Sequence, residues 1–236
     1  MSGRYRPQHA IRTEVEDLQA VLAVAQVEAV FGVRSGGLVA LEAARTLPGI
    51  RTVAVYEPAL RVRAADDARW LACFDREIAD GEVAAALVTS MVGLELAPPA
   101  MRTMPRRLLV ALTALTMRKE EKTASPDAIT MRALAPTVRH EGDLVAELAG
   151  HAEAFRTVTA DVLLLGGSKG LAFTDPARDE LARVLPRVRR VEFPGFDHGA
   201  SSDSSTTNRG SNPQTVAAVA RELRSFLVAA AGPSST

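Results

Sequence analysis

Short apolar runs alternate with helical patterns in the first quarter of the chain. Residues 27–33 and 51–56 are rich in β-branched and other apolar side chains, which is typical of buried strands. Between these runs, residues 38–46 show a helical pattern that ends at Pro48 and Gly49. The order strand, helix, strand with short connections predicts a parallel sheet.

The middle of the chain, residues 64–159, shows helical patterns interrupted by prolines and no clear strand pattern. The helices are expected near residues 70–78, 83–92, 106–117 and 144–155. Strand patterns return at 161–165 and 189–193, and a last helix is expected over 213–228. Residues 1–236 are therefore predicted to form a single α/β domain, with about four parallel strands and a helical insertion at 64–159.

Charge and composition exclude several classes of protein. The chain has 28 basic and 28 acidic residues, so no overall field would attract nucleic acid or an anionic membrane. No run reaches the roughly 18 apolar residues that a membrane span needs, and residues 1–11 lack the apolar core of a secretory signal. Cys73 is the only cysteine, and the histidines lack metal-ligand spacing. We expect a cytoplasmic protein that has no metal or other cofactor and binds neither nucleic acid nor membrane.

Two stretches at the ends of predicted strands carry the chemistry. Residues 30–37 read VFGVRSGG where a strand turns into a helix, and residues 193–199 read FPGFDHG after the last strand. They resemble the nucleophile elbow, commonly VFGHSxGG, and the catalytic-histidine loop of α/β-hydrolases, in the same order. The resemblance covers most of the chain. It implies the α/β-hydrolase fold, with residues 64–159 as a helical lid and a serine-type enzyme acting on a small-molecule substrate.

The elbow departs from the family pattern at its central position. If Gly32 and Gly36 lie two residues before and after the nucleophile, that position holds Arg34, which has no nucleophilic oxygen. Moving the frame by one residue makes Ser35 the nucleophile, but the branched Val33 would then crowd the turn. The two glycines favour the first frame. The resemblance then implies that Ser35 is at most a compromised nucleophile, and that Arg34 and Gly36 contact the substrate. These glycines could also form nothing more than a tight turn.

His198 is the candidate general base, because it follows a predicted strand in a polar loop flanked by glycines. The position where the family usually carries its acid falls within residues 166–170, which contain no carboxylate. Asp175 lies a few residues further on as a weak substitute, and Glu57 at the end of the second strand is the alternative. Glu57 could equally close its strand without any catalytic role. Residues 166–170 also lack the spacing of a phosphate-binding loop.

The front of the chain also departs from the family. In α/β-hydrolases, several strands precede the elbow strand, and one of their loops supplies part of the oxyanion hole. The residues before Thr13 are too few to supply these strands. We therefore expect strand 27–33 at an exposed sheet edge, where it could pair with a second copy to form a homodimer. A truncated start, a partner that covers the edge and a degenerate relative all remain open as explanations.

Two functions follow from the resemblance. The first is an α/β-hydrolase-like protein that hydrolyses an ester or similar bond with weak or lost activity, using Ser35, His198 and Glu57. The alternative is a non-catalytic descendant that binds a small ligand or a protein partner in the old active-site cleft. Arg34 separates the two hypotheses, since a guanidinium favours a carboxylate or other anion over acyl chemistry.

Overall fold

The computed structural model describes residues 9–63, 68–97, 99–125, 128–171, 173–201 and 212–231. The fold divides into two compact units. An α/β unit comprises residues 1–63 and 147–236, and a helical unit comprises residues 64–146. The first eight residues, part of the segment before Thr13, lie outside the described residues.

The α/β unit is built on a parallel sheet in the order β1-β2-β3-β4. Its strands are β1 (Ala29–Val33), β2 (Thr52–Tyr56), β3 (Asp161–Lys169) and β4 (Val188–Asp197). The four predicted strands are confirmed, and β3 and β4 each extend about four residues beyond the predicted end. Those added residues lie at the carboxyl end of the sheet.

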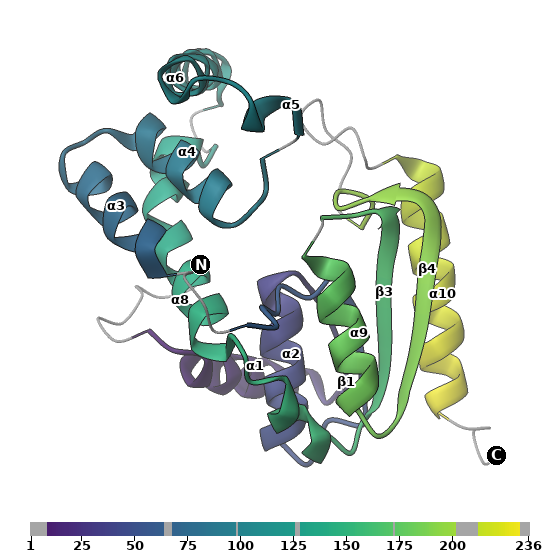
Figure 1. The fold of residues 1–236 in the computed structure, drawn as a ribbon. Coiled ribbons are helices and arrows are strands. Elements are labelled where there is room, and N and C mark those ends of the chain that lie inside the picture. Colours follow the sequence, from purple (N-terminus) through teal and green to yellow (C-terminus); the bar gives the residue numbers. More distant parts are fainter. Residues whose placement is uncertain are drawn as a thin grey trace. The chain divides into compact units, whose positions relative to one another are not determined.

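Helices cover both faces of the sheet (Figure 1). Tyr56 and Leu165 point to the face where Val219 of α10 packs. Val55 points to the opposite face and lies close to Gly37 of α2. A parallel sheet with both faces covered has strands that are apolar on both sides, which explains the continuous apolar runs in the sequence. The helices of this unit are α1 (Ile11–Ala25), α2 (Ser35–Thr46), η2 (Ala152–Thr157), α9 (Thr174–Val184) and α10 (Pro213–Ala231).

The described residues of the second unit form helices and connecting turns and contain no strand. Its helices are α3 (Ala68–Ala79), α4 (Val83–Gly93), α5 (Pro99–Arg102), α6 (Arg106–Thr123), α7 (Met131–Leu134), η1 (Ala135–Thr137) and α8 (Val138–Leu148), the last ending in the α/β unit. The helix predicted over 144–155 was misplaced. Helix α8 ends at Leu148, and the chain turns at Gly150, which has a positive φ of 76°. It then continues as the short 3₁₀ helix η2.

None of the described helices is long and apolar enough to cross a membrane.

Strand β1 lies at the edge of the sheet, as the sequence predicted, and among the described residues it pairs only with β2. Phe31 of this strand and Val27 just before it are 41% and 47% exposed. Val21 and Val24 of the preceding helix α1 are also exposed. An unpaired strand edge with apolar side chains is a surface on which another strand can add.

We therefore expect the chain to self-associate through β1, because zero formal net charge gives little repulsion between copies. Light scattering after size-exclusion chromatography should show a concentration-dependent dimer that Phe31→Lys weakens, since lysine on an edge strand opposes pairing. Leu227→Lys, at another partly exposed apolar residue, is the matched control on α10. A sharp monomer near 25.1 kDa at all concentrations would contradict this expectation.

Candidate active site

Arg34 forms the whole turn between β1 and α2. Its backbone has φ 55° and ψ −121°, a conformation that non-glycine residues seldom adopt. Its N–H donates to the carbonyl of Tyr56 at 3.1 Å, and its carbonyl accepts from Gly37 at 3.0 Å and from Ala59 at 3.2 Å. These three backbone hydrogen bonds hold the sharp turn in place, and Ser35 is the first residue of α2.

Gly32 makes this turn possible. A Cβ at this position would lie 2.3 Å from the carbonyl oxygen of Gly36 and 2.8 Å from Cα of Gly37, both backbone atoms that cannot move aside. At Gly36, in contrast, a Cβ would meet open space. Arg34 is thus the strained residue of the turn, and the position two residues before it requires glycine. This is the frame that the two glycines favour in the sequence.

Glu57 occupies the corresponding position after β2. Since Val33 pairs with Tyr56 in the sheet, Arg34 and Glu57 follow neighbouring strands at the same level. Glu57 also has a positive φ, 45°, and its N–H donates to the carbonyl of Leu165 at 2.9 Å. Strained non-glycine residues tend to cluster at active sites and ligand clamps. Two of them at adjacent strand ends mark this end of the sheet as a candidate site.

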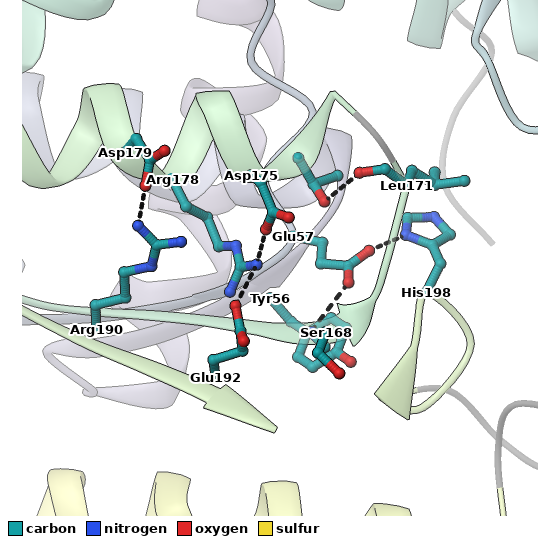
Figure 2. A network of polar contacts seen from close by, with 12 residues as sticks. Tyr56, Glu57, Ser168, Leu171, Asp175, Arg178, Asp179, Arg190, Glu192 and His198 are labelled. Carbon is teal, nitrogen blue, oxygen red and sulfur yellow. Dashed lines mark hydrogen bonds and ion pairs between the residues drawn. The ribbon is translucent and has the colours of Figure 1, made fainter. Parts of the chain in front are cut away.

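Glu57 and His198 form a buried pair (Figure 2). The Glu57 side chain is fully buried, and its Oε2 lies 2.5 Å from Nδ1 of His198, whose side chain is 12% exposed. The other carboxylate oxygen, Oε1, accepts the N–H of Gly167 at 3.2 Å. Because an ionised carboxylate only accepts hydrogen bonds, Nδ1 carries the hydrogen in this pair. Nε2 of His198 is buried and has no hydrogen-bond partner in the described part of the chain.

The glycines of residues 166–170 allow the chain to approach this pair closely. A Cβ on Gly170 would lie 2.2 Å from Oε1 of Glu57, and one on Gly167 would lie 2.1 Å from the carbonyl oxygen of Phe196. The glycine-rich stretch therefore has a structural explanation in the packing around the Glu57 carboxylate. It requires no phosphate ligand.

Tyr56 fixes the loop that carries His198. Its buried hydroxyl donates to the carbonyl of Asp197 at 2.9 Å, one residue before His198. Burial raises the pKa of the Tyr56 phenol well above its usual value, and the nearby negative charges of Glu57 and Asp197 raise it further. The phenol therefore stays protonated and remains a hydrogen-bond donor to this loop.

Asp175, the weaker acid candidate, pairs with Arg178 and not with His198 (Figure 2). Arg178 is fully buried, and its Nη2 also lies 3.4 Å from a carboxylate oxygen of Glu192. A Cβ on Gly166 would lie 2.4 Å from the guanidinium carbon, so the cation packs directly against β3. Sequence reasoning missed Arg178, because one arginine in an amphipathic helix gives no sign of burial.

The remaining sequence-predicted residues lie on the elbow. Arg34 and Gly36 are exposed and Ser35 is half-buried. Ser35 and His198, both within the described part of the chain, do not form a hydrogen bond, and Nδ1 of His198 contacts Glu57 instead. Among the described residues, no group of three or more His, Cys, Asp or Glu side chains could hold a metal ion.

No protein-family model and no curated protein matches this chain. Solved structures do match it over nearly its whole length. An α/β hydrolase from Sphaerobacter thermophilus matches with a TM-score of 0.65 and 23% identity, over 93% of this chain and 76% of that one. A hydrolase from Pseudomonas aeruginosa PA01 matches with a TM-score of 0.58 and 14% identity, over 98% and 75%.

A third match is MGS-M2, an α/β hydrolase from a deep-sea metagenome library of the Medee basin. Its TM-score is 0.54 at 15% identity, over 98% of this chain and 75% of that one. At such identities the similarity concerns the fold and not the substrate. The parallel sheet with helices on both faces agrees with the fold of these neighbours. The chain therefore has the α/β-hydrolase fold.

Proposed function

We propose that this protein is a weak hydrolase that cleaves an ester or similar bond in a small molecule. His198 is the general base, and Glu57 is the carboxylate that orients it. The observation that carries this proposal is the 2.5 Å contact between Glu57 and Nδ1 of His198, since within the described residues Nε2 then has no hydrogen-bond partner. In the Ser-His-Asp triad, the aspartate likewise accepts the hydrogen of Nδ1 and so fixes the imidazole tautomer. Nε2 then takes the proton.

A purely structural role explains this pair less well. Burying a carboxylate is costly unless its oxygens are hydrogen-bonded, and each oxygen of Glu57 has a partner here. The imidazole, however, has one buried nitrogen that finds no hydrogen-bond partner among the residues that the structure describes, an arrangement that is rare in a purely structural role. Strained backbone at both Glu57 and Arg34 adds a further cost at the same place. Energetically unfavourable features that gather at one end of the sheet are typical of an active site.

The elbow residue determines the kind of reaction. Arg34 has no nucleophilic oxygen, so an acyl-enzyme cannot form at this position. We propose that Nε2 of His198 instead takes a proton from a water molecule, whose oxygen attacks the carbonyl carbon of the ester. The tetrahedral intermediate then expels the alkoxide, which takes the proton back from His198. Ester and water give acid and alcohol. Acyl transfer through Ser35 is the alternative route.

Arg34 also suggests which substrates are favoured. Its position at the end of β1 is level with that of Glu57 at the end of β2, and it is exposed. A guanidinium binds carboxylates through parallel hydrogen bonds. We therefore propose that the preferred substrate carries a carboxylate or another anionic group near the bond that is cleaved.

The second candidate function is binding of such an anion without catalysis. The arginine at the elbow favours it, because this substitution removes the nucleophile while it adds a positive charge. The two functions differ in their dependence on His198. Hydrolysis requires its Nε2, whereas anion binding at Arg34 does not.

We expect the purified chain to hydrolyse p-nitrophenyl acetate at least about 10³-fold more slowly than an ordinary esterase, because the elbow lacks a nucleophile. His198→Ala should remove most of the remaining rate, while Ser35→Ala should leave it unchanged. His151→Ala, at an exposed histidine of the same unit, is the matched control. A rate typical of an esterase that Ser35→Ala abolishes would refute this mechanism, and a rate insensitive to His198→Ala would favour the binding function.

The substitution Arg34→Ser restores the family residue at the elbow but should not restore strong catalysis. It returns a hydroxyl to the turn, yet the parts of a triad act as a unit and not additively. Stopped-flow measurement with p-nitrophenyl acetate should therefore show no burst of nitrophenol. A clear burst followed by rapid turnover would show that the rest of the acyl-transfer machinery is intact.

A further inference from the structure

The helical unit contains a cavity of its own among α3, α4, α5 and α6 (labelled in Figure 1), with a volume of about 630 Å³. This volume falls within the range of small-molecule sites, roughly 300–1,000 Å³. Its walls are mainly apolar and are formed by Trp70, Val88, Val92, Met101, Met104 and Leu109. Aliphatic, thioether and indole groups suit an apolar ligand and offer few hydrogen bonds to water.

Two of these wall residues are exposed to solvent. Val92 is 55% exposed and Met101 is 37% exposed. Large apolar side chains that gather in a concave, exposed site are typical of binding surfaces. A ligand that covered both would remove apolar surface from water, which is the main driving force of binding.

The polar wall of the cavity is satisfied within the protein. The hydroxyl of Thr89 donates to Oε2 of Glu77 at 2.6 Å. Nη2 of Arg106 donates to Oε1 of Glu77 at 2.5 Å and to the Thr89 oxygen at 2.8 Å. Because these groups satisfy one another, this wall requires no polar partner from a ligand. The body of the ligand can therefore be apolar.

Arg102 gives the cavity a polar end. Its Nε donates to the carbonyl of Ala97 at 3.1 Å, and its exposed side chain lines the cavity. The charged residues of the lining are Arg102, Arg106 and Glu95, and Arg106 is already paired with Glu77. Arg102 is thus the guanidinium of the lining that can bind an anionic end through charge-assisted hydrogen bonds.

Trp70 is held rigidly in the wall. A Cβ on Gly93 would lie 2.3 Å from its indole ring, and a Cβ on Gly142 would lie 2.9 Å from it. Phe74 packs edge-to-face against the same ring, with 5.9 Å between the ring centres. These contacts fix the indole before any ligand binds, which lowers the entropic cost of binding.

We propose that this cavity binds a small amphiphile with an apolar body and one anionic end, with the anionic end at Arg102. The proposal concerns residues of the helical unit alone. It does not depend on whether His198 and Glu57 catalyse hydrolysis.

Trp70 provides the assay, because it is the only tryptophan of the chain and lies in the cavity wall. The full chain is titrated with decanoate, 1-decanol and decyltrimethylammonium, all below their micellar concentrations, and the tryptophan emission is recorded. We expect a saturable change with decanoate, weaker binding of 1-decanol and the weakest binding of the cation. Calorimetry of the same titrations detects binding that leaves the emission unchanged.

Three variants locate the site. Arg102→Gln should weaken the binding of decanoate about tenfold and leave that of 1-decanol unchanged, since it removes a hydrogen bond to a charged group. Glu95→Gln should increase the affinity for decanoate slightly. Val92→Phe fills the cavity and should weaken all three probes, whereas Val216→Phe, at an exposed valine of α10, is the matched control. Circular dichroism verifies that each variant is folded.

Several outcomes would overturn the proposal. These are the absence of saturable binding by both methods, equal affinity for the three head groups, or unchanged decanoate affinity in folded Arg102→Gln or Val92→Phe.

Discussion

The buried carboxylate of Glu57 is the constraint on which the candidate site depends. A carboxylate without solvent exposure must be fully hydrogen-bonded, and here His198 and the N–H of Gly167 satisfy it. These two partners come from the ends of β4 and β3, while Glu57 itself follows β2. One side chain thus links three strand ends. Any change that moves one of them also disturbs the other two.

The sheet brings these groups together through its parallel register. Tyr56 pairs with Val33 on one side and with Leu165 on the other, so the next residues of all three strands reach the same level. In open α/β sheets, ligands bind at this end, beyond the carboxyl ends of the strands. The close approach requires glycine at 167 and 170, because a Cβ at either position would overlap the histidine loop or the carboxylate. The site therefore follows from the register together with a few positions that exclude side chains.

The sequence predicted the parts of this arrangement that are local. Buried parallel strands are continuous apolar runs, so all four were identifiable, and the glycines around Arg34 located the turn. The choice between Glu57 and Asp175 depended on a contact between residues 141 positions apart, for which a single sequence has no signal. The burial of Arg178 and the end of α8 at Leu148 were missed for related reasons. An arginine on a helix face is usually exposed, and the apolar pattern continued past Gly150 into η2.

At this end of the sheet, Arg34 and Glu57 follow neighbouring strands and Glu57 contacts His198. The proposed function rests on the contact between Glu57 and His198. Nitrogen–proton correlation NMR of the histidine side chains tests it most directly, with the His198 signals assigned by their loss in His198→Gln. The predicted result is a hydrogen on Nδ1 that is bonded to the Glu57 carboxylate, a signal that Glu57→Gln removes or weakens. A hydrogen on Nε2 in the unmodified chain, or a spectrum that Glu57→Gln leaves unchanged, would contradict the account.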